Sequence, residues 1–384
     1  MVNVRLGDVV ARIKDKVDPL ELIYYVGGEH FEYGSVTVDN KAFIQGSTIG
    51  PAFHIRFKPG DVLLMSRNPH LRKAGMVDFE GLCSDVSYVC RTRDENVLMQ
   101  RCLPFVFQTD DFWRFAEANK KGSTNFFLNW SDFEKYEFPL PPLAEQKKLA
   151  KVLWAMERTK RAYKELLTQT KALAKSRFVE MFGDPTAKTS QWKMSPLVEL
   201  GELSRGVSKA RPRNSPDLLG GPYPLVQTGE VSNAGLWIKS YNATYSEKGL
   251  AQSRMWRKGT LCITIAANIA QTGILTFDAC FPDSVVGFIP NDRTNAIFIH
   301  FWFSFFQSIL ESQAPQVAQK NINLKILSEL RVIEPPVALQ NAFAAFVAEV
   351  DKSEFALKQS LEKLTVAQKA LMNQAFRGTP GPLD

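Results

Sequence analysis

The segment Pro141-Pro142-Leu143-Ala144-Glu145-Gln146 recurs 194 residues later as Pro335-Pro336-Val337-Ala338-Leu339-Gln340. The same offset aligns Phe182 with Phe376, each 36 residues after the glutamine of its motif. It also aligns Val4-x-Leu6-Gly7-Asp8 with Val198-x-Leu200-Gly201-Glu202. Agreement at one offset in three separate places indicates an internal duplication, which takes precedence over local patterns in predicting a fold. We therefore predict two copies of one unit, each a globular domain followed by a helix.

Each repeated motif is predicted to open a long helix. Apolar residues recur at three- and four-residue spacing over 149–178 and again over 343–371, which is typical of about five heptads of amphipathic helix. The Pro-Pro pairs suit the start of a helix and not its interior. Gly183 and Gly378 suit helix ends, and a proline follows each of them closely. The helices are expected within segments 140–184 and 334–378.

The two helices are expected to pair as an antiparallel coiled coil, which would give the chain a pseudo-two-fold repeat. Each apolar stripe contains one charged residue near its middle, Lys160 and its repeat mate Glu354. We expect these two side chains to meet across the seam and fix its register, as polar seam residues can. Two solvated side chains on imperfect stripes are the alternative interpretation.

The remaining segments predict two α+β domains, residues 1–139 and 185–333, with 379–384 as a tail. Short β-like runs separated by Gly and Pro occur in both, for example 61–65, 86–90, 260–265 and 284–288. Helices are expected at 111–119 and around 297–312. Each domain is read as a curved, mainly antiparallel sheet with some helix, so that both are mixed α/β domains of similar build.

Composition and charge limit the classes of function. The 384 residues have a formal net charge of +7, which makes an anionic partner plausible without naming it. Residues 1–139 carry 17 basic and 19 acidic side chains, whereas 140–183 carry 10 and 4. The first domain could therefore bind DNA only through a local basic patch. The five cysteines form no C-x-x-C pair, and this pattern, with no signal peptide or membrane span apparent, predicts reduced thiols in a cytoplasmic protein and no metal site.

No catalytic constellation can be assembled from the sequence. The phosphate-binding loop, the dinucleotide-binding glycines and the hydrolase nucleophile elbow are all absent, and only four histidines occur. The Pro-Pro motifs lack the Asp or Asn and the aromatic residue of an adenine methyltransferase loop. Asp39-x-Lys41 and Glu145-x-Lys147 have the spacing of a nuclease pair but no upstream carboxylate partner, and are read as surface charges. The sequence therefore predicts no recognisable catalytic site and no recognisable cofactor-binding site.

Several of these motifs together resemble the specificity (S) subunit of type I restriction–modification systems, over nearly the whole chain. The matching stretches are 139–146 (Pro-Leu-Pro-Pro-Leu-Ala-Glu-Gln), 181–185 (Met-Phe-Gly-Asp-Pro), Trp192 with Leu200-Gly201-Glu202, and the strand-like runs 59–63, 68–73, 258–265 and 284–286. Leu339 departs from the family pattern, since the first motif has Glu145 at this position. This departure bears on the contact that the second helix would make with a partner.

The resemblance implies two target-recognition domains, residues 1–139 and 185–333, alternating with two conserved helical spacers, residues 140–184 and 334–378. Each domain would read one half of a bipartite site in double-stranded DNA. The helices would set the gap between the halves and dock methyltransferase (M) subunits, two of them by expectation, which bind S-adenosylmethionine and modify adenine. Restriction (R) subunits join some complexes of this kind, and the chain itself would have no catalytic activity.

Candidate DNA-binding residues are polar or basic side chains in segments broken by Gly or Pro. Arg and Lys supply phosphate contacts, and Arg, Asn and Gln also read base edges. In the first domain they are Gln45, Ser47, Thr48, Ser66, Arg67, Asn68, His70, Arg72, Lys73, Lys120 and Lys121. In the second domain they are Arg205, Ser208, Lys209, Arg211, Arg213, Asn214, Gln227, Thr228, Asn268, Gln271, Thr272 and Lys320. A solvated loop is the alternative for each.

A coiled-coil adaptor with two protein-binding end domains is the main alternative function. The repeat and the helices fit it equally well, but the basic loops do not. An enzyme with an unfamiliar site is the other alternative, and the scarcity of histidine weighs against it. Salt-dependent binding to duplex DNA would distinguish a DNA reader from an adaptor, because phosphate contacts release counterions.

Overall fold

The computed structural model describes residues 2–185, 187, 190–213, 215–266, 269–305 and 322–376. Its contacts divide the chain into two compact units, Met1–Leu166 with Leu357–Asp384, and Leu167–Ala356. Each unit therefore contains one globular domain, one half of the first long helix and one half of the second. No helix in the described ranges is long and apolar enough to cross a membrane.

The first unit is built on two four-stranded sheets. One has the order β2-β9-β6-β7 and the other β4-β3-β8-β5, and β1 pairs separately with β10. The strands are β1 (Val2–Arg5), β2 (Val10–Ile13), β3 (Tyr24–Val26), β4 (Ala42–Phe43), β5 (Phe53–Phe57), β6 (Val62–Met65), β7 (Ala74–Met76), β8 (Gly81–Ser84), β9 (Ser87–Thr92) and β10 (Glu137–Leu140). The helices are α1 (Leu6–Val9), α2 (Leu103–Phe107), α3 (Asp110–Ala118) and α4 (Trp130–Phe133).

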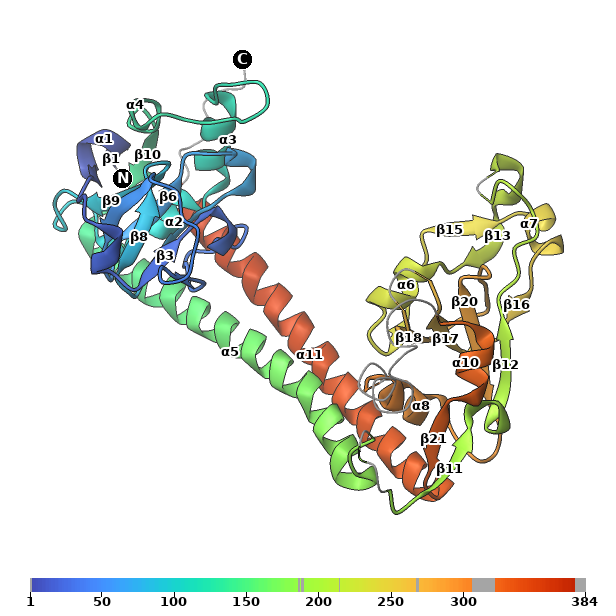
Figure 1. The fold of residues 1–384 in the computed structure, drawn as a ribbon. Coiled ribbons are helices and arrows are strands. Elements are labelled where there is room, and N and C mark those ends of the chain that lie inside the picture. The colour runs from blue at the N-terminus through green and yellow to red at the C-terminus, as the bar shows by residue number, and fades with distance from the viewer. Residues whose placement is uncertain are drawn as a thin grey trace. The chain divides into compact units, whose positions relative to one another are not determined.

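The second unit has a five-stranded sheet, β12-β20-β17-β18-β14, and a four-stranded sheet, β15-β13-β19-β16 (Figure 1). Its strands are β11 (Lys193–Pro196), β12 (Gly201–Arg205), β13 (Leu219–Leu225), β14 (Trp237–Ile238), β15 (Ala243–Tyr245), β16 (Met255–Trp256), β17 (Leu261–Thr264), β18 (Thr272–Leu275), β19 (Ala279–Cys280), β20 (Val285–Pro290) and β21 (Arg331–Glu334). Its helices are α6 (Thr228–Asn233), α7 (Glu247–Ala251), α8 (Ala296–Phe303) and α10 (Leu324–Glu329).

These elements confirm the predicted α+β class and the similarity of the two domains. The four strand predictions correspond to β6, β9, β17 and β20, and the helix predicted at 111–119 corresponds to α3. The helix predicted at 297–312 is α8 as far as residue 303, and residues 306–312 lie outside the described ranges. The sheets were expected to be mainly antiparallel, and they also contain the parallel pairs β3–β8, β13–β19 and β14–β18.

A short antiparallel ribbon connects each domain to its long helix. Strand β10 pairs with β1 and is followed by α5 (Leu143–Phe182). Strand β21 pairs with β11 and is followed by α11 (Val337–Phe376). The repeat offset places Phe138 on β10 and Val332 on β21 at equivalent core positions, and both are buried. Gly183, at φ +83°, follows α5 in the left-handed conformation that a helix end favours.

The repeated glutamine of each Pro-Pro motif is a buried clamp between helix and domain. The Gln146 amide donates from Nε2 to the carbonyls of Val97 (2.8 Å) and Pro141 (2.9 Å), and its Oε1 accepts from the Met99 backbone N–H (3.0 Å). In the second unit the Gln340 side chain likewise donates two hydrogen bonds and accepts one. Nε2 donates to the carbonyls of Arg293 (3.0 Å) and Pro335 (2.8 Å), and Oε1 accepts from Thr294 Oγ1 (2.9 Å).

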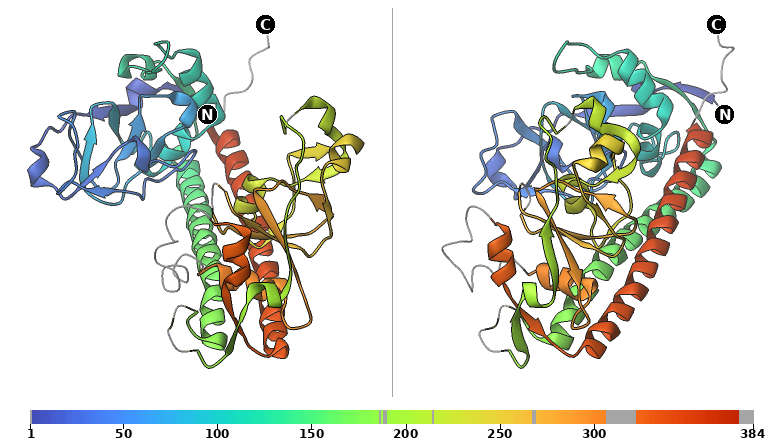
Figure 2. Two further views of the ribbon diagram at one scale, coloured as in Figure 1. Left: turned by 45° about the vertical axis from the view of Figure 1, so that its right-hand side comes forward. Right: turned by 90° about the vertical axis from the view of Figure 1, so that its right-hand side faces the viewer.

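The two long helices pack against each other in an antiparallel direction (Figure 2). In the first unit, Leu153 near the start of α5 shares a core with Met372 and Phe376 near the end of α11. In the second unit, Phe178 near the end of α5 lies 5.5 Å, between ring centroids, from Phe343 near the start of α11. The predicted coiled-coil pairing of the helices is confirmed.

The predicted pairing of Lys160 with Glu354 is wrong. Lys160 Nζ bonds instead to Glu157 Oε2 (3.0 Å) and to Gln368 Oε1 (2.7 Å) within the first unit. Glu354 precedes Gln368 by 14 residues on α11, or roughly 21 Å at about 1.5 Å per residue. The register therefore places the two polar positions at different levels of the seam.

Candidate nucleic-acid interface

The predicted basic loop of the first domain, residues 66–73, connects β6 to β7. It contains a short 3₁₀ turn, Pro69–Leu71, between two residues with positive φ, Asn68 at 50° and Arg72 at 47°. The Asn68 backbone N–H donates to the Phe126 carbonyl (2.9 Å), which ties the loop to a second segment. The turn leaves the side chains of Arg67 and His70 exposed, so these two are the most accessible members of the loop.

Two other cations of this loop are engaged within the protein. Arg72 pairs with Asp110 at the start of α3 (2.6 Å), and Lys73 Nζ donates to the Gly28 carbonyl (2.6 Å). The Asp110 carboxylate also accepts from Lys369 and Asn373 of α11, both at 3.0 Å. Burial opposes ionisation of Asp110, but the three hydrogen bonds outweigh it and lower its pKa to about 2. Arg72 and Lys73 therefore fix the loop in place.

A hollow of about 300 Å³ lies beside Arg67 and contains a residue that the sequence did not indicate. Arg12 of β2 lines it together with Ser66, Arg67, Asp85 and four other residues. The Arg12 guanidinium lies over the Tyr88 ring (4.1 Å to the centroid) and donates to the Asp85 carbonyl (3.1 Å). Arg12 comes from an ordinary strand pattern, which carries no local signal for ligand binding.

The other first-domain candidates occupy two separate places. Gln45, Ser47 and Thr48 follow β4, where the Ser47 hydroxyl donates to the Ile44 carbonyl (2.6 Å). Gln45 and Thr48 are exposed. Lys120 pairs with Glu117 (2.8 Å) and Lys121 with Asp132 (2.7 Å), close to the segment that binds the 66–73 loop. All of these remain predictions as DNA contacts.

The basic loop of the second domain follows β12, and the structure brings an acid into it. Arg211 Nη2 lies 3.6 Å from Asp283 Oδ2, and Arg213 Nη2 lies 2.5 Å from Asp283 Oδ1. Arg205 Nε donates to the Asp283 backbone carbonyl (3.0 Å). Lys209 is exposed, whereas Ser208 is buried and its hydroxyl has no partner among the described residues. More than 70 residues separate Arg211 from Asp283, so their contact has no local signal in the sequence.

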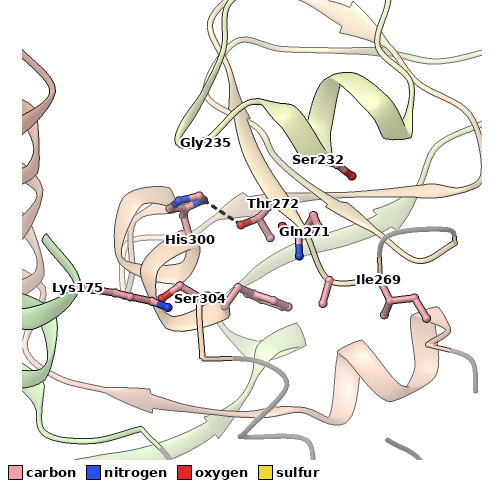
Figure 3. A pocket seen from close by; sticks show the side chains of 10 residues that line it. Lys175, Ser232, Gly235, Ile269, Gln271, Thr272, His300 and Ser304 are labelled. Carbon is pink, nitrogen blue, oxygen red and sulfur yellow. Dashed lines mark hydrogen bonds between the residues drawn. The ribbon is translucent and has the colours of Figure 1, made fainter. Parts of the chain in front are cut away.

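The remaining second-domain candidates lie around α6 and β18. Gln227 and Thr228 start α6, where the Gln227 backbone N–H donates to Glu230 Oε2 (3.0 Å). Gln271 and Thr272 line a cavity of about 410 Å³, shown in Figure 3. In this cavity Thr272 Oγ1 bonds His300 Nδ1 (2.8 Å), and burial lowers the His300 pKa to about 4. Asn214, Asn268 and Lys320 lie outside the described residues.

Within the described part of the chain, no group of three or more His, Cys, Asp or Glu residues is placed to hold a metal ion. All five cysteines are free and buried. Burial raises the pKa of the Cys102 thiol to about 12 and raises the pKa of the other four. These thiols are therefore protonated core groups and weak nucleophiles.

Known proteins are similar to this chain in sequence over most of its length. The profile of the family described as type I restriction modification DNA specificity domain matches residues 1–171 and again residues 189–365. A putative type I restriction enzyme MjaX specificity subunit of Methanocaldococcus jannaschii is 23% identical over 277 residues, which are 69% of this chain and 64% of that protein. The match thus spans less than two thirds of this relative.

Solved structures of similar fold come from the same kind of system. One chain, from work on complex assembly and conformational transition of the type I R-M system, superimposes with a TM-score of 0.62 at 20% identity, covering 98% of this chain and 97% of that chain. The type I restriction-modification system S subunit from M. genitalium gives 0.59 at 16% identity, covering 99% and 96%. These two similarities establish a shared fold. Because the family profile matches both halves of the sequence, the chain belongs to the type I restriction modification DNA specificity domain family.

Proposed function

We propose that this chain is the DNA sequence-specificity subunit of a type I restriction–modification complex. Each globular domain reads one half of a bipartite site in double-stranded DNA. The antiparallel helices set the gap between the halves and dock methyltransferase subunits, and restriction subunits join where the system has them. The observation that supports this most is the duplication itself, because two similar domains on one helical scaffold match a target with two separate parts.

The two domains are similar in fold but differ in the side chains they expose, which supports two different half-sites. The first domain exposes His70 and also Arg67, which lines the same hollow as Arg12. The second exposes Lys209 and an arginine pair held by Asp283. Arginine is the side chain that most often reads guanine in the major groove, and lysine and arginine also hold phosphates.

Methyl transfer belongs, in this proposal, to the partner subunits. They bind S-adenosylmethionine and modify an adenine in each half-site, and this chain tells them where to act. The chain needs no cofactor for its own part, since reading DNA requires only hydrogen bonds, apolar contacts and charge. The buried clamps of Gln146 and Gln340 support this role, because they fix each domain on its helix.

Long-read mapping of methylated adenine tests the proposal directly. Cells that hold the partner methyltransferase should show a split motif with a fixed gap only when this chain is also present. A map that stays unchanged, with the partner shown to be active, would support the adaptor alternative instead. Salt-dependent binding of the purified complex to duplex DNA gives an independent measurement, because each phosphate contact contributes about −0.9 to the slope of log K against log salt.

Replacing Arg67 with alanine should relax one half of the methylated motif and leave the other half intact. The expected loss is about 1–3 kcal/mol at the affected base pair, the usual discrimination of a bidentate arginine contact. Arg114→Ala is the matched control, since this exposed arginine on α3 pairs with Asp111 (3.1 Å) and belongs to no candidate loop. Uniform weakening of methylation at unchanged motifs would assign Arg67 to a phosphate.

A further inference from the structure

Three arginines of the second domain converge on one aspartate, Asp283, in the turn before β20. Its carboxylate faces Arg211 and Arg213, and its backbone carbonyl accepts from Arg205. Arg211 is held further by two bonds from Nη1 to the carbonyls of Ser208 and Ala210, both 2.7 Å. The side chains of Arg211, Arg213 and Asp283 keep exposures of 57%, 44% and 33%, so the cluster is ordered and still open to a ligand.

The first domain contains a related arrangement, in which one arginine bonds the backbone carbonyl of an aspartate. Asp85 occupies the equivalent turn before β9, and Arg12 donates to its carbonyl as Arg205 does to that of Asp283. Backbone bonds establish the equivalence: the N–H of Ser66 donates to Val86 (2.8 Å), and that of Ile265 donates to Ser284 (3.0 Å). Asp85 is exposed and lines the hollow that contains Arg12 and Arg67. Each domain therefore places one acid inside its basic surface.

An acid in this position acts against phosphate binding. A phosphate held by Arg211 or Arg213 would lie within a few ångströms of the Asp283 carboxylate, well inside the ~10 Å screening length at 0.1 M salt. Random duplex binds almost entirely through such phosphate contacts. The pairs between Asp283 and the arginines are exposed and therefore weak, so Asp283 competes with a phosphate for these arginines but does not exclude it. Asp283 thus lowers affinity for random sequence without blocking the loop.

The same acid favours binding that depends on geometry. Ordering a long side chain on binding lowers affinity by roughly two- to tenfold, and this loss is avoided for a side chain that is already held. Asp283 and the backbone carbonyls hold the guanidinium groups before DNA arrives. A base edge requires a defined arginine orientation, whereas a phosphate accepts many.

We propose that Asp283 is a specificity-determining residue of the second domain: it opposes phosphate binding and orients Arg211 and Arg213 for base contact. The proposal rests on the function proposed above and adds the residue through which this domain discriminates against random DNA. The first step is to compare wild-type complex on a duplex with the methylated motif and on a duplex with that motif scrambled. Selective binding by the wild type supports the proposed function and makes Asp283 testable on its own.

The Asp283→Asn complex should bind the scrambled duplex about eightfold more tightly at 0.1 M salt, because one added phosphate contact steepens the log–log salt slope by about 0.9. Its affinity for the motif duplex should not rise, so the ratio of the two affinities should fall roughly five- to tenfold. Asp292→Asn is the matched control, since this exposed aspartate lies beyond the opposite end of β20 and should change neither affinity. Thermal unfolding of both variants checks that the domain stays folded.

Three results would overturn the proposal while leaving the function intact. An equal gain in affinity for both duplexes would show that Asp283 acts only through the overall charge of the domain. An equal loss in affinity would show that it is a structural residue. An unchanged salt slope with unchanged affinities would remove it from the interface. A wild-type complex that does not distinguish the two duplexes would instead contradict the proposed function itself.

Discussion

Replacing Lys160 with methionine is expected to lower the free energy of unfolding by about 3 kcal/mol, because removal of one partner leaves a buried charge uncompensated. Lys160 and Glu157 have side-chain exposures of only 13% and 8%, and Gln368 is 2% exposed. Gln368 completes the network by donating from Nε2 to Glu157 (3.1 Å) and to the Leu153 carbonyl (3.2 Å). The variant would retain the Glu157 carboxylate in this seam with only the glutamine as donor.

Two further variants separate a lost pair from lost packing. The combination Glu157→Leu, Lys160→Met and Gln368→Leu removes every charge and should recover most of the stability, as apolar replacements of buried ion pairs often do. Lys352→Met on α11 is the exposed control, since its bond to Glu349 (2.6 Å) joins side chains that are each 71% exposed, and it should cost less than about 1 kcal/mol. Urea-induced unfolding measures all three. A loss from Lys160→Met no larger than that of Lys352→Met would contradict the assigned role.

The sequence predicted the scaffold well because its signals are periodic or repeated. The 194-residue offset, the 3/4 spacing of apolar residues and the Pro-Pro starts lead directly to α5 and α11. Strands β6, β9, β17 and β20 were found from compact apolar runs between Gly and Pro, and all four are buried in sheet centres. Such signals are carried by neighbouring residues, so a single sequence contains them.

The register of the helix pair could not be predicted from such local signals. The stripes fix which face of each helix is buried, but they repeat every turn or two and tolerate several alignments. In the first unit the alignment follows from end contacts such as those of Met372 and Phe376 with the domain core. The asparagine Asn373 adds a bond to Asp110. Lys160 therefore meets Gln368, a residue that the pattern did not distinguish.

The sequence predicted the separate segments of the candidate site but not the contacts that bring them together. The basic loops were identified, but the partners that orient them come from distant positions: Asp110 for Arg72, and Asp283 for Arg211. The role of the motif glutamines was also missed, although Gln146 and Gln340 themselves define the repeat. Apart from the Thr294 hydroxyl that bonds Gln340, their partners are backbone carbonyls and an N–H group, which carry no side-chain identity that a sequence could reveal.

Replacing Glu334 with glutamine should lower the free energy of unfolding at pH 7 by about 2–3 kcal/mol. Arg293 donates to both carboxylate oxygens of Glu334 (2.7 and 2.6 Å), and Ser195 Oγ donates to Oε2 (2.6 Å). The hydrogen bonds from Arg293 are the largest cause of a pKa lowered to about 2, with burial acting against them. The carboxylate is 16% exposed, so solvent screens this interaction only in part.

The direction of the pH dependence follows from the depressed pKa. Glu334 in the unfolded chain binds a proton near its ordinary pKa, whereas in the folded chain it stays ionised until about pH 2. Its contribution is therefore complete above about pH 5 and is lost as the pH falls toward 2. Urea-unfolding curves at pH 7, 5, 4 and 3 should show wild type and Glu334→Gln converging on the acid side. Glu349→Gln, which removes an exposed carboxylate of α11, should remain close to wild type throughout.

A constant difference between wild type and Glu334→Gln across this range would show that the loss is one of packing and not of charge. The expected convergence would instead show that an ion pair holds the junction of the second domain. Glu334 is the last residue of β21 and directly precedes Pro335-Pro336 and α11, while Ser195 lies on the paired strand β11. Arg293 and Thr294 connect the same junction to Gln340, through the Arg293 carbonyl and the Thr294 hydroxyl. The Arg293–Glu334 ion pair and the Gln340 hydrogen bonds thus stabilise the same junction. There the domain proposed to read DNA is joined to the helix proposed to set the distance to the other half-site.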